Sequence, residues 1–147
     1  MSEGSLQDLY QSILIQHSKS PLNFGKLEAF THFSVGYNPL CGDAISVYLL
    51  VKQGTIEKAS FESASCAICT ASASILLEAI EGIEKESFTS IQNEFSQILE
   101  DGSKGQSDTL SPDILAFQGI KHFPSRRNCA LLPWTTLKEA LDSEIKD

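Results

Sequence analysis

Residues 44–63, AISVYLLVKQGTIEKASFES, decide the fold. Alternate side chains of an extended strand share one face, and Ile45, Val47, Leu49 and Val51 fall on the same face. Lys52-Gln53-Gly54 has the composition of a tight turn, and residues 56–63 have that of a partner strand. The stretch therefore predicts an antiparallel β-hairpin.

The flanking segments extend this hairpin. Residues 31–38 predict a short strand that ends before Pro39, which gives a sheet of three antiparallel strands. On the other side, residues 66–80 are rich in Ala, Ile and Leu and predict a buried helix that ends at Gly82.

Further helices are predicted before and after this central part. Their start signals are Ser5 with Asp8, Ser87, and Ser111-Pro112-Asp113, and a last helix ends near residue 142. Residues 101–109 predict an exposed loop, and Pro133 is expected in the first turn of the last helix, because proline deeper in a helix removes a hydrogen bond. The predicted fold class is α+β: a small three-stranded antiparallel sheet packed with about five helices, in one domain over residues 1–147.

Charge and hydropathy exclude several functions. The chain of 147 residues carries a net charge of −8, and residues 78–101 hold seven acids against one lysine. This segment is either a solvated helical face or a docking face for a basic partner. The excess of negative charge argues against nucleic-acid binding, which needs clustered Lys and Arg. No apolar run approaches the roughly 18 residues of a membrane span, and no signal peptide is apparent, so we expect a cytoplasmic protein that does not enter membranes.

Four cysteines, at positions 41, 66, 69 and 129, carry the candidate chemistry. A cytosolic chain more often uses such residues for metal binding or catalysis than for disulfides. Cys41, Cys66 and Cys129 all fall at the ends of predicted elements, where side chains from different parts of the chain can converge. Asp43 follows Cys41 by two residues, and Gly42 between them lets the backbone bend so that both side chains reach one point. Three thiolates and one carboxylate form a tetrahedral ligand set that zinc accepts, so Cys41, Asp43, Cys66 and Cys129 are the predicted metal ligands.

The sequence also leads to expectations for Cys69, the three histidines and two aromatic residues. Cys69 either packs in the core as a small hydrophobic residue or serves as a spare thiol or redox partner of Cys66. His17 is expected on the surface or at a helix end, with His32 similar, and His122 is a distant alternative ligand near Cys129. Phe123 and Trp134 are expected in the core rather than as anchors for a partner.

Several separated motifs resemble one family. They are Leu9-Tyr10 with Ile15, His17, Lys19, Pro21, Asn23 and Gly25; Asn38-Pro39-Leu40-Cys41-Gly42-Asp43; Phe61-Glu62 through Cys66 to Ala71-Ser72-Ala73-Ser74; and Phe123-Pro124 with Arg126 and Cys129. Together these resemble the U-type iron–sulfur cluster assembly proteins (the NifU N-terminal, IscU and SufU family) over roughly residues 6–140, and SufU most closely. Cys66 and Cys129 lie 63 positions apart, and the extra segment near residues 98–118 is similar to the SufU insertion. Asn128 stands where scaffold-type members carry His, and their Leu-Pro-Pro-Val-Lys motif is missing.

The resemblance implies a mechanism. SufU-type proteins bind zinc through the equivalents of the four predicted ligands and accept persulfide sulfur, here on Cys41, from a SufS-type PLP-dependent cysteine desulfurase. A desulfurase histidine then replaces the first cysteine on zinc and frees it, and Arg126 is the expected docking residue. Downstream scaffold proteins are the expected sulfur acceptors. Ser65 in place of Gly, Asn128 in place of Lys, and the presence of Cys69 depart from the family pattern.

Three functions from different classes follow. The first is a zinc-dependent sulfurtransferase that carries sulfur on Cys41. The second is a scaffold on which a [2Fe–2S] cluster is assembled on the same thiolates, with iron as the metal. The third is a small domain whose zinc is only structural.

Overall fold

The computed structural model describes residues 3–40, 42–101 and 112–143. In chain order the elements are α1 (Glu3–Lys19), β1 (His32–Asn38), β2 (Asp43–Lys52), β3 (Thr55–Ala64), α2 (Ala67–Ile80), η1 (Lys85–Ser87), α3 (Phe88–Asp101), η2 (Pro112–His122) and α4 (Pro124–Leu141). The four α-helices and the long 3-10 helix η2 make the five helices predicted, while η1 is a single turn. The predicted α+β class is confirmed for the described ranges.

The three strands form an antiparallel sheet in the order β1-β2-β3. The β2–β3 turn has positive φ at both central residues, 53° at Gln53 and 79° at Gly54, which is the geometry of a two-residue hairpin turn that follows the twist of the strands. Ile45, Val47 and Leu49 are buried, as their shared face predicts, while Val51 is only half-buried and follows an irregularity in the β2–β3 register between Leu50 and Val51. The hairpin and the third strand are therefore confirmed.

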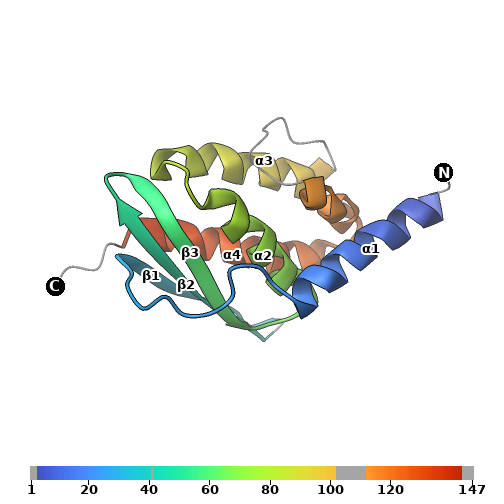
Figure 1. Ribbon diagram of the computed structural model, residues 1–147. Coiled ribbons are helices and arrows are strands. Elements are labelled where there is room, and N and C mark those ends of the chain that lie inside the picture. Colours follow the sequence, from blue (N-terminus) through green and yellow to red (C-terminus); the bar gives the residue numbers. More distant parts are fainter. Residues whose placement is uncertain (1–2, 41, 102–111, 144–147) are drawn as a thin grey trace.

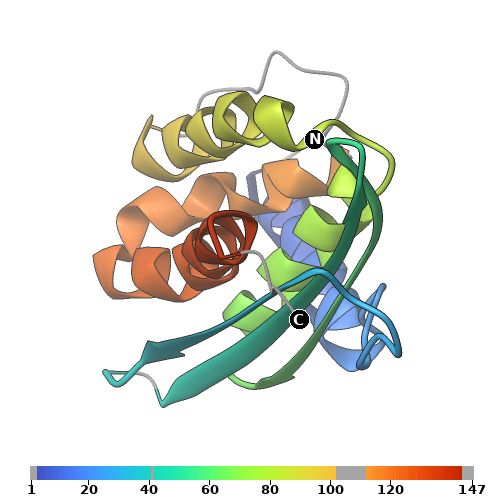
Figure 2. The same cartoon turned by 90° about the vertical axis from the view of Figure 1, so that its left-hand side faces the viewer.

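The helices lie on one face of the sheet. α4 packs against β1 and β2, α2 packs against β3 and α4, and α1, η2 and α3 complete the helical side. Figure 1 shows α1 leaving the body of the molecule toward the N-terminus, and Figure 2 shows the helices beside the long strands. Within the described residues, no helix has both the length and the apolar character that a bilayer crossing requires.

The core joins these layers. α2 is buried along most of its length, and Gly82 has a φ of 91° just after its end, which confirms the predicted stop. Trp134 of α4 is fully buried and stacks on Phe95 of α3 with ring centroids 4.3 Å apart and planes 7° apart. This burial confirms the expectation that Trp134 is a core residue.

The last helix corrects one prediction. α4 begins at Pro124 and contains Pro133 in its interior, so the expectation that Pro133 lies in the first turn is wrong. Ser72 of α2 contacts α4 close to this proline: its Oγ donates to the carbonyl oxygen of Ala130 at 2.6 Å and accepts Trp134 Nε1–H at 3.0 Å. Proline at position 133 removes the N–H that would bond the carbonyl oxygen of Cys129, while the buried hydroxyl of Ser72 ties α2 to α4 at the next residue along the backbone.

Two smaller boundaries also differ. α1 begins at Glu3, so Ser5 lies inside the helix and the predicted cap is wrong. The segment beginning at Pro112 is helical as predicted, but its hydrogen bonding is of the 3-10 type. Ser111 and most of the loop predicted at residues 101–109 lie outside the described residues.

Candidate metal centre

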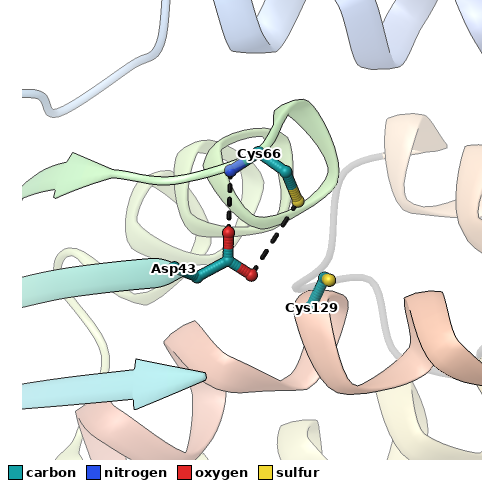
Figure 3. A group of neighbouring side chains, drawn as sticks. All are labelled: Asp43, Cys66 and Cys129. Carbon is teal, nitrogen blue, oxygen red and sulfur yellow. Dashed lines mark hydrogen bonds between the residues drawn. The ribbon is translucent and has the colours of Figure 1, made fainter. Parts of the chain in front are cut away.

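Asp43 stands at the start of β2 and pairs with Asn38, the last residue of β1. Its side chain is 2% exposed. One carboxylate oxygen, Oδ1, accepts the backbone N–H of Cys66 at 2.8 Å, and Oδ2 lies 3.9 Å from Cys66 Sγ (Figure 3). A buried carboxylate needs such compensation. One oxygen is thus occupied by the backbone while the other faces a sulfur.

Cys66 joins β3 to α2. It is the N-cap residue of α2, with extended backbone angles (φ −69°, ψ 167°), and its carbonyl oxygen accepts the N–H of Thr70 at 3.0 Å. The side chain is half-buried and leaves the backbone where strand passes into helix. Since the start of a helix carries partial positive charge, the Asp43 carboxylate beside it is electrostatically favoured.

Cys129 reaches the same point from α4. Because α4 begins at Pro124, Cys129 lies inside the helix and not at its start as predicted. Its side chain is fully buried. Its Sγ lies 3.7 Å from Asn38 Nδ2 and 3.9 Å from the carbonyl oxygen of Ser125.

These three side chains converge. One ligand atom from each of Asp43, Cys66 and Cys129 lies within 4.8 Å of the others (Figure 3). In a tetrahedral zinc site, bonds of about 2.0–2.3 Å place donor atoms about 3.3–3.8 Å apart, so small side-chain movements bring the three to that spacing. Two sulfurs and one carboxylate oxygen also match the ligand chemistry of zinc. The residues present therefore fit a metal ion.

The fourth predicted ligand, Cys41, lies outside the described residues. Its neighbour Gly42 has a φ of 71°, a left-handed conformation that glycine adopts without strain. Glycine at position 42 is thus suited to this conformation, while the expected convergence of Cys41 with Asp43 stays a prediction. The role of Cys41 as a ligand stays a prediction.

Cys69 does not belong to this group. It is fully buried in the hydrophobic core and does not contribute to the described group of metal-ligating side chains. Among the three described cysteines there is no disulfide bond. These positions confirm the packing interpretation of Cys69.

The histidines have other roles. His17 lies in the last turn of α1, so its expected place at a helix end is confirmed, but it is not a surface residue: its side chain is 11% exposed, and its ring nitrogens lie 2.8 Å from Ser74 Oγ and from Asp113 Oδ2. It thereby connects α1 to α2 and η2, a contact between remote segments that spacing does not reveal. His32 is buried at the start of β1, so the surface expectation is also wrong there. The side chain of His122 lies outside the described residues.

Phe123 corrects a further expectation. It is 60% exposed, not buried, and lies on the rim of a cleft of about 380 Å³ that Leu14 and Ile120 also line. Its position between η2 and α4 directs it away from the core. Arg126, the expected docking residue, is exposed in the first turn of α4.

Asn38 is the neighbour of the site that sequence reasoning passed over. It was noted only as part of a motif, yet its amide contacts the sulfur of Cys129. The sequence carries no signal for this, because the apolar residues of β1 (Phe33, Val35 and Tyr37) alternate on the face opposite Asn38.

Comparison with known proteins identifies the family. Residues 9–130 match the family described as NifU-like N terminal domain. The chain belongs to this family. Membership confirms the resemblance to the IscU and SufU proteins.

Several relatives match the chain over most of its length, and their names give them different roles. The zinc-dependent sulfurtransferase SufU of Bacillus subtilis is 34% identical over 141 residues, covering 96% of this chain and 95% of that protein. The iron–sulfur cluster assembly scaffold protein IscU of Thermotoga maritima is 36% identical over 135 residues, covering 90% and 92%. A crystal structure of a SUF-system cluster assembly scaffold protein from Fervidobacterium islandicum has a TM-score of 0.81 at 31% identity, covering 92% of this chain and 98% of that chain. These descriptions place the family in iron–sulfur cluster assembly and divide between transfer and scaffold roles.

Proposed function

We propose that this protein is a zinc-dependent sulfurtransferase that accepts persulfide sulfur on Cys41 from a SufS-type cysteine desulfurase and delivers it for iron–sulfur cluster assembly. The observation that carries the proposal is the convergence of Asp43, Cys66 and Cys129 at the end of the β1–β2 hairpin, next in sequence to Cys41. The full-length similarity to a SufU sulfurtransferase supports it. Asp43, Cys66, Cys129 and Cys41 would hold the zinc ion. Bound zinc would keep these thiols in the thiolate form and protect them from oxidation.

The residues of the proposed site have different roles. Asp43 and Cys129 are buried and held by hydrogen bonds, so they anchor the site. The Cys41 thiolate attacks the terminal sulfur of the desulfurase persulfide. A new S–S bond forms on Cys41 as the old one breaks, and the desulfurase cysteine leaves as a thiolate. The transfer consumes no external oxidant or reductant.

The surface around the hairpin end supports docking of a protein donor. Leu40, which precedes Cys41, is 88% exposed, and Tyr37 on the same hairpin is 71% exposed. Exposed apolar side chains beside a reactive group favour contact with a partner. Arg126 in the first turn of α4 adds a positive charge that an acidic surface of the desulfurase would meet.

A second candidate is a scaffold that assembles a [2Fe–2S] cluster on the same thiolates. Two observations favour it: relatives of similar identity are described as scaffold proteins, and thiolates bind iron–sulfur clusters as readily as zinc. In that case iron and sulfide are the cargo of the protein.

Metal analysis and anaerobic reconstitution separate the two candidates. The transferase proposal expects a colourless protein with about one zinc per chain, which iron and sulfide do not displace. It also expects increased desulfurase turnover when the protein is added. A stable visible absorbance after reconstitution, with zinc released and no increase in desulfurase turnover, would favour the scaffold.

A further inference from the structure

Asn38 occupies an unusual place for an amide. It is the last residue of β1, it pairs with Asp43 across the hairpin, and its side chain is only 8% exposed. It shares the inner face of β1 with Gly36, whose backbone lies against Thr136 of α4. Burying an amide is costly unless it forms hydrogen bonds. A specific partner for Asn38 is therefore expected at this position.

The partner is a sulfur atom. Asn38 Nδ2 donates to Cys129 Sγ at 3.7 Å, within hydrogen-bonding range for sulfur. A metal-bound cysteine is a thiolate, which accepts hydrogen bonds and donates none. The amide N–H of Asn38 therefore matches the metal-bound form of Cys129, whereas the carbonyl oxygen of Ser125, 3.9 Å away, matches the thiol form.

The sulfurs of Cys66 and Cys129, the two described cysteines of the site, have different surroundings. Cys66 is half-buried and its Sγ lies 3.9 Å from Asp43 Oδ2, an acceptor. Cys129 is fully buried and has an amide donor beside it. A hydrogen bond to a thiolate withdraws electron density from the sulfur and makes it a weaker nucleophile. Residues outside the ligand set that orient metal ligands in this way affect metal affinity substantially.

We infer that Asn38 is a positioning residue that holds the Cys129 sulfur in the metal site and lowers its nucleophilicity. This inference rests on the proposed function, because it assumes that the group binds a metal. It assigns Cys129 to permanent metal binding and leaves sulfur transfer to Cys41. Asn38 acts through Cys129 and does not touch the transferred sulfur.

The test replaces Asn38 with residues of similar size. Asn38→Leu removes the donor, and Asn38→Asp replaces it with a negative acceptor that faces the sulfur. Thr136→Val is the matched control, because Thr136 packs under β1 and its hydroxyl bonds only within α4 in the described contacts. Zinc affinity is measured by competition with a chromophoric chelator, and cobalt(II) substitution reports the sulfur-to-metal charge-transfer absorption.

We expect zinc affinity to fall about tenfold in Asn38→Leu and further in Asn38→Asp. We also expect the cobalt charge-transfer band to move to lower energy in Asn38→Leu, because the sulfur becomes richer in electrons. Thr136→Val should keep the wild-type values of both. If Asn38→Leu fails to fold, as judged by circular dichroism, the Asp variant decides the matter.

Unchanged zinc affinity and an unchanged cobalt spectrum in a folded Asn38 variant would overturn the inference. Equal losses in Thr136→Val would also overturn it, because they would show a general effect of β1 packing. Neither measurement involves the desulfurase. A protein that binds zinc with the expected Asn38 dependence but does not stimulate the desulfurase would therefore refute the proposed function and leave this inference standing.

Discussion

The carboxylate of Asp43 accepts the backbone N–H of Cys66 at 2.8 Å and so ties the start of β2 to the start of α2. The same carboxylate faces the Cys66 sulfur through its other oxygen. One buried residue thus fixes the junction of two elements and, under the proposed function, would supply a ligand atom to zinc. Separate substitutions can distinguish these two roles.

Asp43→Asn should weaken zinc binding while leaving the metal-free fold nearly intact. Asparagine keeps an oxygen that accepts the Cys66 N–H, so the free energy of unfolding without metal should change by less than about 1 kcal/mol. Each tenfold loss of zinc affinity should lower the zinc-induced stabilisation by about 1.4 kcal/mol. Thermal unfolding with and without zinc measures both effects. An undiminished zinc-induced rise in Tm would show that Asp43 is not a ligand.

Gly36→Ala should destabilise the fold. A Cβ at this position would clash with Oγ1 of Thr136 and lie 3.2 Å from Leu132 Cδ1, so β1 would have to move away from α4. We expect a loss of about 1–3 kcal/mol in urea unfolding. Adding Thr136→Ala should recover part of this loss in a double-mutant cycle. Strictly additive losses would contradict the proposed clash.

His17→Ala should also destabilise the protein, because it removes the contacts to Ser74 and Asp113 that hold α1 to α2 and η2. The expected loss is about 1–3 kcal/mol. Lys19→Ala, in the same last turn of α1 but exposed, is the control and should change stability by less than about 0.5 kcal/mol. Similar urea midpoints for the two variants would mean that His17 does not hold α1 in place.

Tyr48 should make stability sensitive to alkaline pH. Burial raises the pKa of Tyr48, and its hydrogen bond to Glu62 raises that pKa further. The folded state therefore keeps the phenol proton at pH values where the unfolded chain loses it. Stability should fall as pH rises above about 10, the ordinary tyrosine pKa.

Tyr48→Phe isolates this contribution. The difference in unfolding free energy between wild type and Tyr48→Phe should be constant below about pH 9 and should shift in favour of the variant above about pH 10. Urea unfolding across this range measures it. A difference that does not vary with pH would contradict the raised pKa.

Local sequence patterns were enough to predict most of the fold. The alternation of residues 44–51, the turn at Gln53-Gly54 and the Ala-rich segment that became α2 each specify their structure through neighbouring residues, and the structure agrees with them. Pro133 and Phe123 were misassigned because their environments depend on remote segments. Ser72 of α2 binds the backbone of α4 near Pro133, and the side chain of Phe123 lies beside α1.

The candidate site, like the fold, could be predicted from the sequence only in part. Residue type, together with the spacing of Asp43 from Cys41, selected Asp43, Cys66 and Cys129, which the structure brings together, although Cys129 lies inside α4 and not at an element end. The contact between Asn38 and Cys129 depends on how α4 crosses β1, and no spacing within the sequence encodes that crossing. The sulfur-carrying role of Cys41 came only from family resemblance.

The most direct test of the central claim is mass spectrometry of Cys41 after incubation of the zinc-loaded protein with a SufS-type desulfurase and cysteine. The peptide containing Cys41 should gain the mass of one sulfur atom, and desulfurase turnover should rise. Cys41→Ala should abolish both effects, whereas Cys69→Ala should keep them, because Cys69 is buried in the core. Undiminished stimulation by Cys41→Ala, or sulfur found only on another cysteine, would contradict the account.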